Sequence, residues 1–179
     1  MIVSLIGFRG AGKTTVGRLV ATRLGAPFAD ADEAIAAAAG ASIAEIFSRE
    51  GEAGFRAREE AALATLLASA AGRSVVSLGG GAVLSSANRE RMRAAGLVVY
   101  LEARPATLRE RLAADPATAA SRPALVRGSK DAVAEIDDLL AARRPLYEST
   151  AHERVVVDDR SPEAIADEIA MLVLARRVL

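Results

Sequence analysis

Residues 7–14 near the start of the chain have the types and spacing needed to hold phosphate groups, reading Gly-Phe-Arg-Gly-Ala-Gly-Lys-Thr. Glycines in this pattern let successive backbone N–H groups point inward at phosphate oxygens. Lys13 would bring a positive charge to the β- and γ-phosphates, and the Thr14 hydroxyl can bind Mg²⁺. The alternative is a glycine-rich turn that contains a lysine by coincidence.

The sequence on either side favours the phosphate-binding interpretation. The apolar residues 1–6 predict a buried strand, and residues 13–24 predict a helix whose positive N-terminal end faces the same anion. We therefore expect ATP to bind at Gly10, Ala11, Gly12, Lys13, Thr14 and Thr15.

Two acids follow the second apolar run at spacing i, i+2, Asp30 and Asp32. Ligands collect at the carboxyl ends of strands in open α/β sheets, so both acids are expected to face the site. Either acid could instead cap a helix that begins near Glu33.

Short apolar runs alternate with alanine-rich helical segments along the chain. Strands are expected at residues 2–6, 27–29, 74–78, 97–101 and 154–157. Their side chains do not alternate between polar and apolar, which is typical of a parallel sheet covered on both faces. Helix-capping patterns occur at residues 42–45 and 161–163. The sequence therefore predicts one α/β domain over residues 1–179, a three-layer α/β/α sandwich around a five-stranded parallel sheet.

Residues 113–123 break this alternation, with two prolines, small side chains and no apolar period. Inside a compact domain such a segment favours a lid, expected at about residues 113–128, in which Arg122 is the cation that reaches the nucleotide. A surface loop without function is the alternative.

Composition narrows the class of protein. Lys plus Arg equals Asp plus Glu at 23 each, so no net charge favours nucleic acid or an acidic membrane. The chain has no cysteine and one histidine, which excludes disulfides and thiolate metal sites and disfavours histidine-based metal binding. Its apolar runs are shorter than a bilayer span, and residues 1–8 lack the features of a signal peptide, so we expect a cytoplasmic protein.

Six motifs in order resemble those of the shikimate kinases. After the phosphate loop come Asp-x-Asp at 30–32, Phe-Arg-x-x-Glu at 55–59, Gly-Gly-Gly at 79–81, Arg-Pro at 122–123 and Arg-x-Pro-Leu-Tyr at 143–147. This resemblance implies Mg-dependent transfer of the ATP γ-phosphate to the 3-hydroxyl of shikimate, giving shikimate 3-phosphate and ADP in the fifth step of the chorismate pathway. It also implies a monomer.

The resemblance implies a shikimate-binding segment at about residues 32–60. It assigns acceptor-binding roles to residues in this segment and to others later in the chain. Asp32 would bind the shikimate hydroxyls and orient or deprotonate the nucleophile. Arg56 and Arg143 would clamp the carboxylate, and the backbone of Gly79, Gly80 and Gly81 would line the pocket. Glu59 would hold the Arg56 guanidinium, with Arg58 and Arg144 left as surface charges and Phe55, Tyr147 and His152 as packing or surface residues.

On the nucleotide side the resemblance makes Lys13, Asp32 and Arg122 catalytic. Asp30 would support the Mg²⁺ shell through water, and Arg111 and Arg160 would lie against the adenine. The third strand, at residues 75–78, has no acid where many P-loop enzymes carry one, and Ser121 stands where an acid is common in relatives.

Three other interpretations stay open at this stage. A kinase for another small hydroxy acid, such as gluconate, would share the phosphate loop and the architecture. A nucleoside monophosphate kinase would need a base pocket between Asp32 and Gly54, where none is evident. A non-catalytic sensor would bind the ligand without turnover.

Overall fold

The structure, a computed structural model, describes residues 1–69, 73–114 and 135–176. At its centre lies a five-stranded sheet in the order β2-β3-β1-β4-β5, in which every neighbouring pair is parallel. Its strands are β1 (Ile2–Ile6), β2 (Phe28–Asp30), β3 (Ser74–Ser77), β4 (Gly96–Glu102) and β5 (Glu153–Val156).

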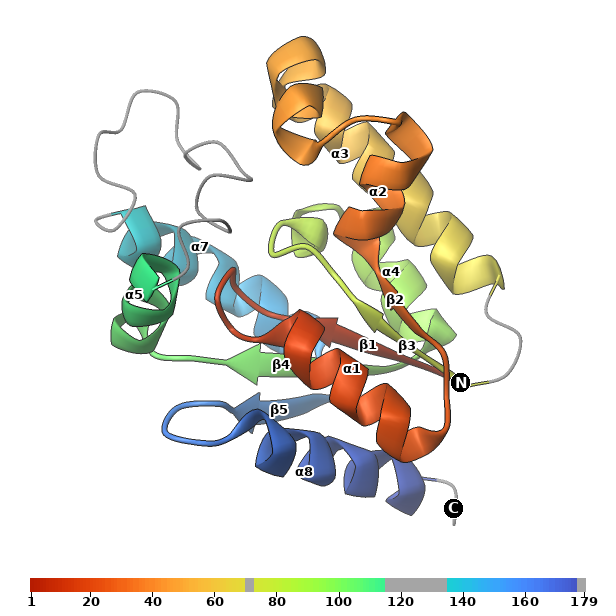
Figure 1. Ribbon diagram of the computed structural model, residues 1–179, viewed down its shortest axis with the longest axis vertical. Helices are drawn as coiled ribbons and strands as arrows, with labels where there is room; N and C mark the ends of the chain where they lie inside the picture. The colour runs from red at the N-terminus through yellow and green to blue at the C-terminus, as the bar shows by residue number, and fades with distance from the viewer. Residues whose placement is uncertain (70–72, 115–134, 177–179) are drawn as a thin grey trace.

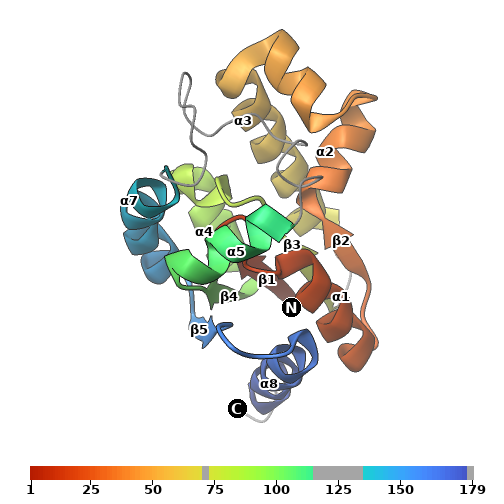
Figure 2. The same cartoon turned by 60° about the vertical axis from the view of Figure 1, so that its left-hand side comes forward.

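Helices cover both faces of this sheet, as Figures 1 and 2 show. On one face α1 (Lys13–Leu24) packs against α8 (Pro162–Ala175), and on the other lie α3 (Ile43–Ser69), α4 (Ser86–Ala95) and α7 (Glu135–Thr150). The remaining helical elements are α2 (Ala31–Ala39), α5 (Pro105–Ala114) and the short 3₁₀ helix η1 (Ala82–Leu84). The expected three-layer α/β/α architecture is confirmed.

The two central strands β1 and β4 are largely apolar because both faces of the sheet are covered, whereas the edge strand β5 begins with Glu153 and Arg154. All five residues of β1 are buried, and the central positions of β4 are buried as well. The expected strand boundaries differ from the observed ones by about one residue. The second strand, expected at 27–29, runs to Asp30, because Asp30 pairs in register with Ser77 of β3.

Local side-chain caps set several helix starts. Ser42 and Glu45 form the expected reciprocal cap, with the Ser42 N–H donating to Oε2 of Glu45 at 2.8 Å and the Glu45 N–H to Oγ of Ser42 at 3.2 Å. Ser161 caps α8 by accepting from the Ala164 N–H at 3.2 Å. The expected start of α2 near Glu33 is wrong, because Asp30 caps the helix and α2 begins directly at Ala31.

His152, interpreted as a surface residue, is half-buried instead. Its backbone N–H donates to the Val98 carbonyl at 2.8 Å, and its ring Nδ1 accepts from the Val98 N–H at 3.1 Å. His152, the residue before β5, thus extends the hydrogen bonding between β5 and β4. No local sequence pattern indicates this contact. In the part of the chain that the structure describes, no helix is long and apolar enough to cross a membrane.

Candidate active site

The phosphate loop, residues 7–14, connects the end of β1 to the start of α1. Gly10 and Gly12 adopt left-handed φ angles of 86° and 89°, which a residue with a Cβ rarely takes. Nζ of Lys13 donates to the carbonyls of Gly7 at 2.9 Å and Phe8 at 2.8 Å, so the lysine lies along the loop. The loop therefore places backbone N–H groups, a helix N-terminus and an ammonium group around one space, which is an arrangement that binds phosphate.

Thr14 reaches from the start of α1 to the carboxyl end of the neighbouring strands. Its hydroxyl donates to Oδ2 of Asp30 at 2.7 Å, and Oγ of Ser77 lies 3.5 Å from the same hydroxyl. The acid missing from β3 is thus supplied by β2, because Asp30 and Ser77 are partners in the sheet.

These oxygen atoms suit a magnesium ion. Mg²⁺ prefers hydroxyl and carboxylate oxygen, and it usually keeps waters and substrate phosphates instead of an all-protein shell. Among the described residues no group of three or more His, Cys, Asp or Glu could hold a metal ion by itself. Thr14 and Asp30 therefore have the right chemistry to hold Mg²⁺ together with a bound nucleotide.

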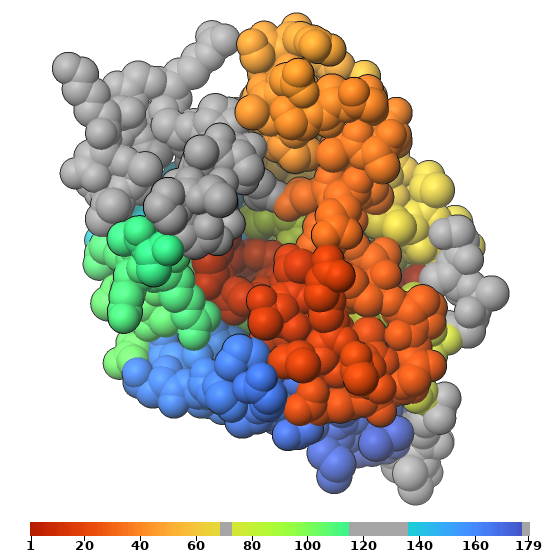
Figure 3. Space-filling model, in the orientation of Figure 1, coloured from red at the N-terminus to blue at the C-terminus, as the bar shows by residue number. Residues whose placement is uncertain are grey.

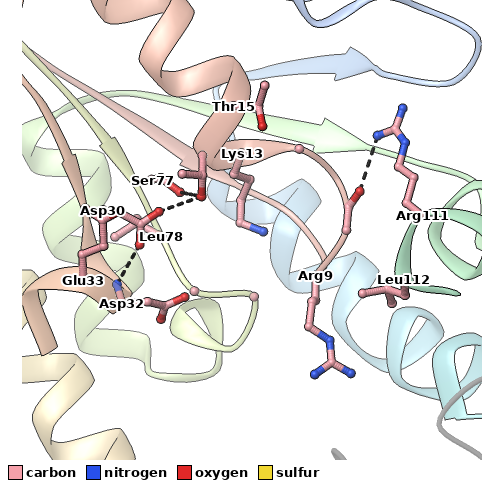
Figure 4. A pocket seen from close by; sticks show the side chains of 15 residues that line it. Arg9, Lys13, Thr15, Asp30, Asp32, Glu33, Ser77, Leu78, Arg111 and Leu112 are labelled. Atoms are coloured by element: carbon pink, nitrogen blue, oxygen red, sulfur yellow. Dashed lines mark hydrogen bonds between the residues drawn. The ribbon is translucent and has the colours of Figure 1, made fainter. Parts of the chain in front are cut away.

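A cavity of about 550 Å³ opens over the phosphate loop. Figure 3 shows the hollow beside the orange α2–α3 segment, and in Figure 4 Lys13 and Asp32 extend into the same space. The lining includes ten of the expected site residues: Gly10, Gly12, Lys13, Thr14, Thr15, Asp30, Asp32, Gly79, Gly80 and Arg111. The expected phosphate side and the expected acids thus lie around one cavity.

The cavity also has lining residues to which the sequence assigned no role, namely Arg9, Glu33, Ser77, Leu78 and Leu112. Arg9 lies inside the phosphate-loop motif, so the motif itself could have indicated that Arg9 borders the cavity. Leu112 carries no such signal, because its approach depends on where α5 packs, and a methyl at Gly10 would lie 3.3 Å from its Cγ.

Arg56 lies against the glycine-rich turn after β3. Its Nη1 donates to Oε2 of Glu59 at 2.6 Å, and a Cβ on Gly81 would lie 2.2 Å from that nitrogen. Only glycine therefore leaves room for the guanidinium in this position. Glu59 is 2% exposed, and burial raises its pKa while the charge of Arg56 opposes that rise. The expected holding contact between Glu59 and Arg56 is present.

Arg143 approaches the same turn from α7. It is 8% exposed, its Nη1 lies 3.5 Å from the carbonyl oxygen of Gly80, and its guanidinium lies 5.8 Å from the centre of the Phe8 ring. The adjacent Arg144 is half-buried and pairs with Glu102 at 3.3 Å, so the two neighbouring arginines have separate environments. Arg56 and Arg143 thus reach the consecutive glycines Gly81 and Gly80.

The arginines expected near adenine are not equivalent. Arg111 lines the cavity and donates to the carbonyls of Gly10 at 3.4 Å and Val157 at 3.2 Å. Arg160 is not among the described residues that line the cavity, and it pairs with Glu168 at 2.6 Å. Arg122 and most of the expected lid, residues 115–128, lie outside the described residues.

Comparisons with known proteins agree on one family. A family model described as shikimate kinase matches residues 9–173. The chain is 44% identical over 169 residues to the shikimate kinase of Symbiobacterium thermophilum, covering 94% of each protein. It is 44% identical over 176 residues to shikimate kinase 2 of Yersinia enterocolitica, covering 98% of this chain and 97% of the relative. The solved structure of shikimate kinase from Acinetobacter baumannii in complex with shikimate has a TM-score of 0.90 at 36% identity, covering 99% of this chain and 95% of that one.

Proposed function

The chain belongs to the shikimate kinase family, and we propose on this premise that it transfers the γ-phosphoryl group of ATP to the 3-hydroxyl of shikimate. The observation that carries the proposal is the position of the turn at Gly80 and Gly81. Two guanidinium groups lie on this turn, from Arg143 and Arg56, and the same turn borders the cavity over the phosphate loop. A phosphate donor and a small carboxylate-bearing acceptor would therefore bind next to each other.

The phosphate loop and its surroundings would bind the donor. Backbone N–H groups of residues 10–15 and Nζ of Lys13 would contact the phosphates, and Arg111 would border the nucleotide. Thr14 would bind Mg²⁺ directly and Asp30 through a water molecule, and the ion would neutralise charge on the phosphates. For Arg160 and Arg122 the nucleotide contacts stay predictions.

On the acceptor side the two arginines would hold the carboxylate of shikimate. A guanidinium presents two parallel N–H donors that match a carboxylate, and two guanidiniums from separate helices fix the orientation of the ring. The turn of Gly79, Gly80 and Gly81 would let the backbone approach the ring closely.

Asp32 would orient the hydroxyl that attacks. In the transfer, a bond forms between the acceptor oxygen and the γ-phosphorus, and the bond from that phosphorus to the β–γ bridging oxygen breaks, releasing ADP. The hydroxyl proton passes to the Asp32 carboxylate. Since phosphoryl transfer needs mainly positioning and charge stabilisation, Lys13 and Asp32 have the main roles among the described residues.

The proposal also includes a single chain as the working unit and the ATP-containing cytoplasm as its compartment. One chain supplies all of the proposed site residues that the structure describes, which supports a single chain as the working unit.

The test is ADP release by the purified protein with Mg·ATP and shikimate, gluconate, quinate or no acceptor. Turnover only with shikimate supports the proposal. Turnover only with gluconate would make the protein a kinase for another hydroxy acid. Shikimate binding measured by calorimetry, without acceptor-dependent turnover, would make it a ligand sensor.

A further inference from the structure

The carbonyl oxygen of Gly80, in the turn beside the proposed acceptor site, accepts a hydrogen bond from a buried hydroxyl. The hydroxyl of Tyr147 donates to this oxygen at 2.5 Å, and Nη1 of Arg143 lies 3.5 Å from it. Tyr147 has no exposed surface, so water does not compete for the bond. From sequence this tyrosine was interpreted as a packing residue, but its hydroxyl makes a specific contact.

Gly80 also lies against the phosphate loop. A Cβ on Gly80 would lie 3.3 Å from the carbonyl oxygen of Gly7 and 3.3 Å from the backbone nitrogen of Arg9. The backbone of Gly80 therefore packs directly on the loop with little free space. Gly80 therefore contacts both Tyr147 and the phosphate loop, so a shift of the Gly80 peptide relative to the loop would displace the proposed acceptor side from the proposed donor side.

Tyr147 is itself held firmly. Its ring stacks on that of Tyr100, with centroids 5.0 Å apart and an interplanar angle of 18°. Tyr100 belongs to β4 and pairs in register with Ile6, the residue directly before the phosphate loop. Tyr147 and Arg143 are four residues apart on α7, so they lie on the same face of that helix.

We propose that Tyr147 is a positioning residue, whose hydroxyl fixes the Gly79–Gly81 turn, and with it the acceptor carboxylate, at a set distance from the phosphate loop. The proposal rests on the proposed function. Phosphoryl transfer depends on in-line placement of donor and acceptor, so a small displacement of this turn weakens acceptor binding and transfer.

The test compares Tyr147→Phe with Tyr100→Phe, measuring the KM values for shikimate and ATP, kcat and the melting temperature. Both variants remove one hydroxyl from the same stacked pair, and among the described residues Tyr100 makes no hydrogen bond to the glycine-rich turn. We expect Tyr147→Phe to raise the shikimate KM about tenfold, equivalent to about 1.4 kcal/mol, because the Gly80 carbonyl stays buried without its main donor. The ATP KM should change less than about twofold, and Tyr100→Phe should leave both constants within about twofold.

An unchanged shikimate KM in Tyr147→Phe, or equal rises in both KM values, would overturn the positioning role. Absence of shikimate turnover in the unsubstituted protein would overturn the proposed function, and this inference with it.

A second measurement does not require the Tyr147→Phe variant to fold. The chain has two tyrosines, so 3-fluorotyrosine incorporated into the Tyr100→Phe protein labels Tyr147 alone. Shikimate should shift the ¹⁹F resonance of Tyr147. A resonance that does not move at saturating shikimate would contradict the proposal.

Discussion

Thr14 and Asp30 are joined by a hydrogen bond of 2.7 Å from the threonine hydroxyl to Oδ2 of the carboxylate. The other oxygen of Asp30, Oδ1, accepts from the backbone N–H of Asp32 at 2.9 Å. One carboxylate therefore connects the phosphate loop to the N-terminus of α2, where Asp32 stands. The Asp30 carboxylate therefore holds both the proposed metal-binding residue Thr14 and the proposed acceptor-orienting residue Asp32 in position.

Asp30→Asn separates the two tasks of this carboxylate. Asparagine caps helices about as well as aspartate, so the bond to the Asp32 N–H and the melting temperature should be kept. The negative charge is lost, so the Mg²⁺ concentration for half-maximal turnover should rise roughly tenfold. Titration of turnover with Mg²⁺ at saturating ATP measures this. An unchanged Mg²⁺ requirement would remove Asp30 from the proposed metal shell.

Lys13→Ala should lower turnover by at least about 10²-fold, because the ammonium group stabilises charge that develops on the transferring phosphate. Arg18→Ala is the matched control. Arg18 is on the same helix but exposed and paired with Glu33, so its loss should leave kcat unchanged. Steady-state assays on both variants, with melting temperatures, measure the difference. Near-normal turnover of Lys13→Ala would remove the lysine from its role.

Asp32→Asn should also lower turnover by at least about 10²-fold, since the amide keeps the size of the side chain but cannot accept the proton of the acceptor hydroxyl. The backbone N–H of Asp32, which binds Asp30, is not altered by the substitution. Single-turnover measurements with bound ATP and shikimate isolate the chemical step. If that step keeps its rate in the variant, Asp32 serves binding alone.

Much of the fold could be predicted because its determinants are local in the sequence. The continuous apolar runs indicated buried parallel strands, and the phosphate-loop motif indicated the junction of β1 and α1, as observed. The caps at Ser42 and Ser161 also depend on residues three apart. These features need no knowledge of which distant segments meet.

The features that could not be predicted depend on distant segments. The bond from Tyr147 to the Gly80 carbonyl joins residues 67 apart, and its register is fixed by how α7 packs behind the sheet. The contact of Arg111 with the Gly10 carbonyl depends in the same way on the direction of α5. Motif spacing selected Arg143 of the 143–144 pair as the site residue, but it did not indicate that Arg143 is buried or which glycine it touches.

Arg143→Lys should raise the shikimate KM with a smaller effect on the ATP KM, because a point charge does not replace the two parallel donors of a guanidinium. Arg144→Lys is the neighbouring control. Its side chain is 41% exposed and pairs with Glu102, so lysine should preserve this contact and both KM values. A changed ATP KM with an unchanged shikimate KM in Arg143→Lys would assign Arg143 to the nucleotide side.

His152 links the pH dependence of stability to the junction of β4 and β5. Burial lowers the pKa of His152, the charges of Arg93 and Arg176 lower it further, and Glu153 opposes them. Its Nδ1 accepts from the Val98 N–H and so must stay unprotonated for that bond to exist. As the pH falls below the pKa of about 6.5 of histidine in an unfolded chain, the unfolded chain takes up a proton that the native protein resists.

The free energy of unfolding should therefore fall between pH 7.5 and pH 5.5, and His152→Asn should show a smaller fall. Asn Oδ1 can accept from the Val98 N–H in place of Nδ1 but does not titrate, and the chain has no other histidine. Urea unfolding of both proteins at the two pH values measures the difference. Since the unfolded histidine loses its proton as pH rises, the two curves should run parallel above about pH 7.5. An equal loss of stability on acidification in both proteins would assign the pH dependence to other groups.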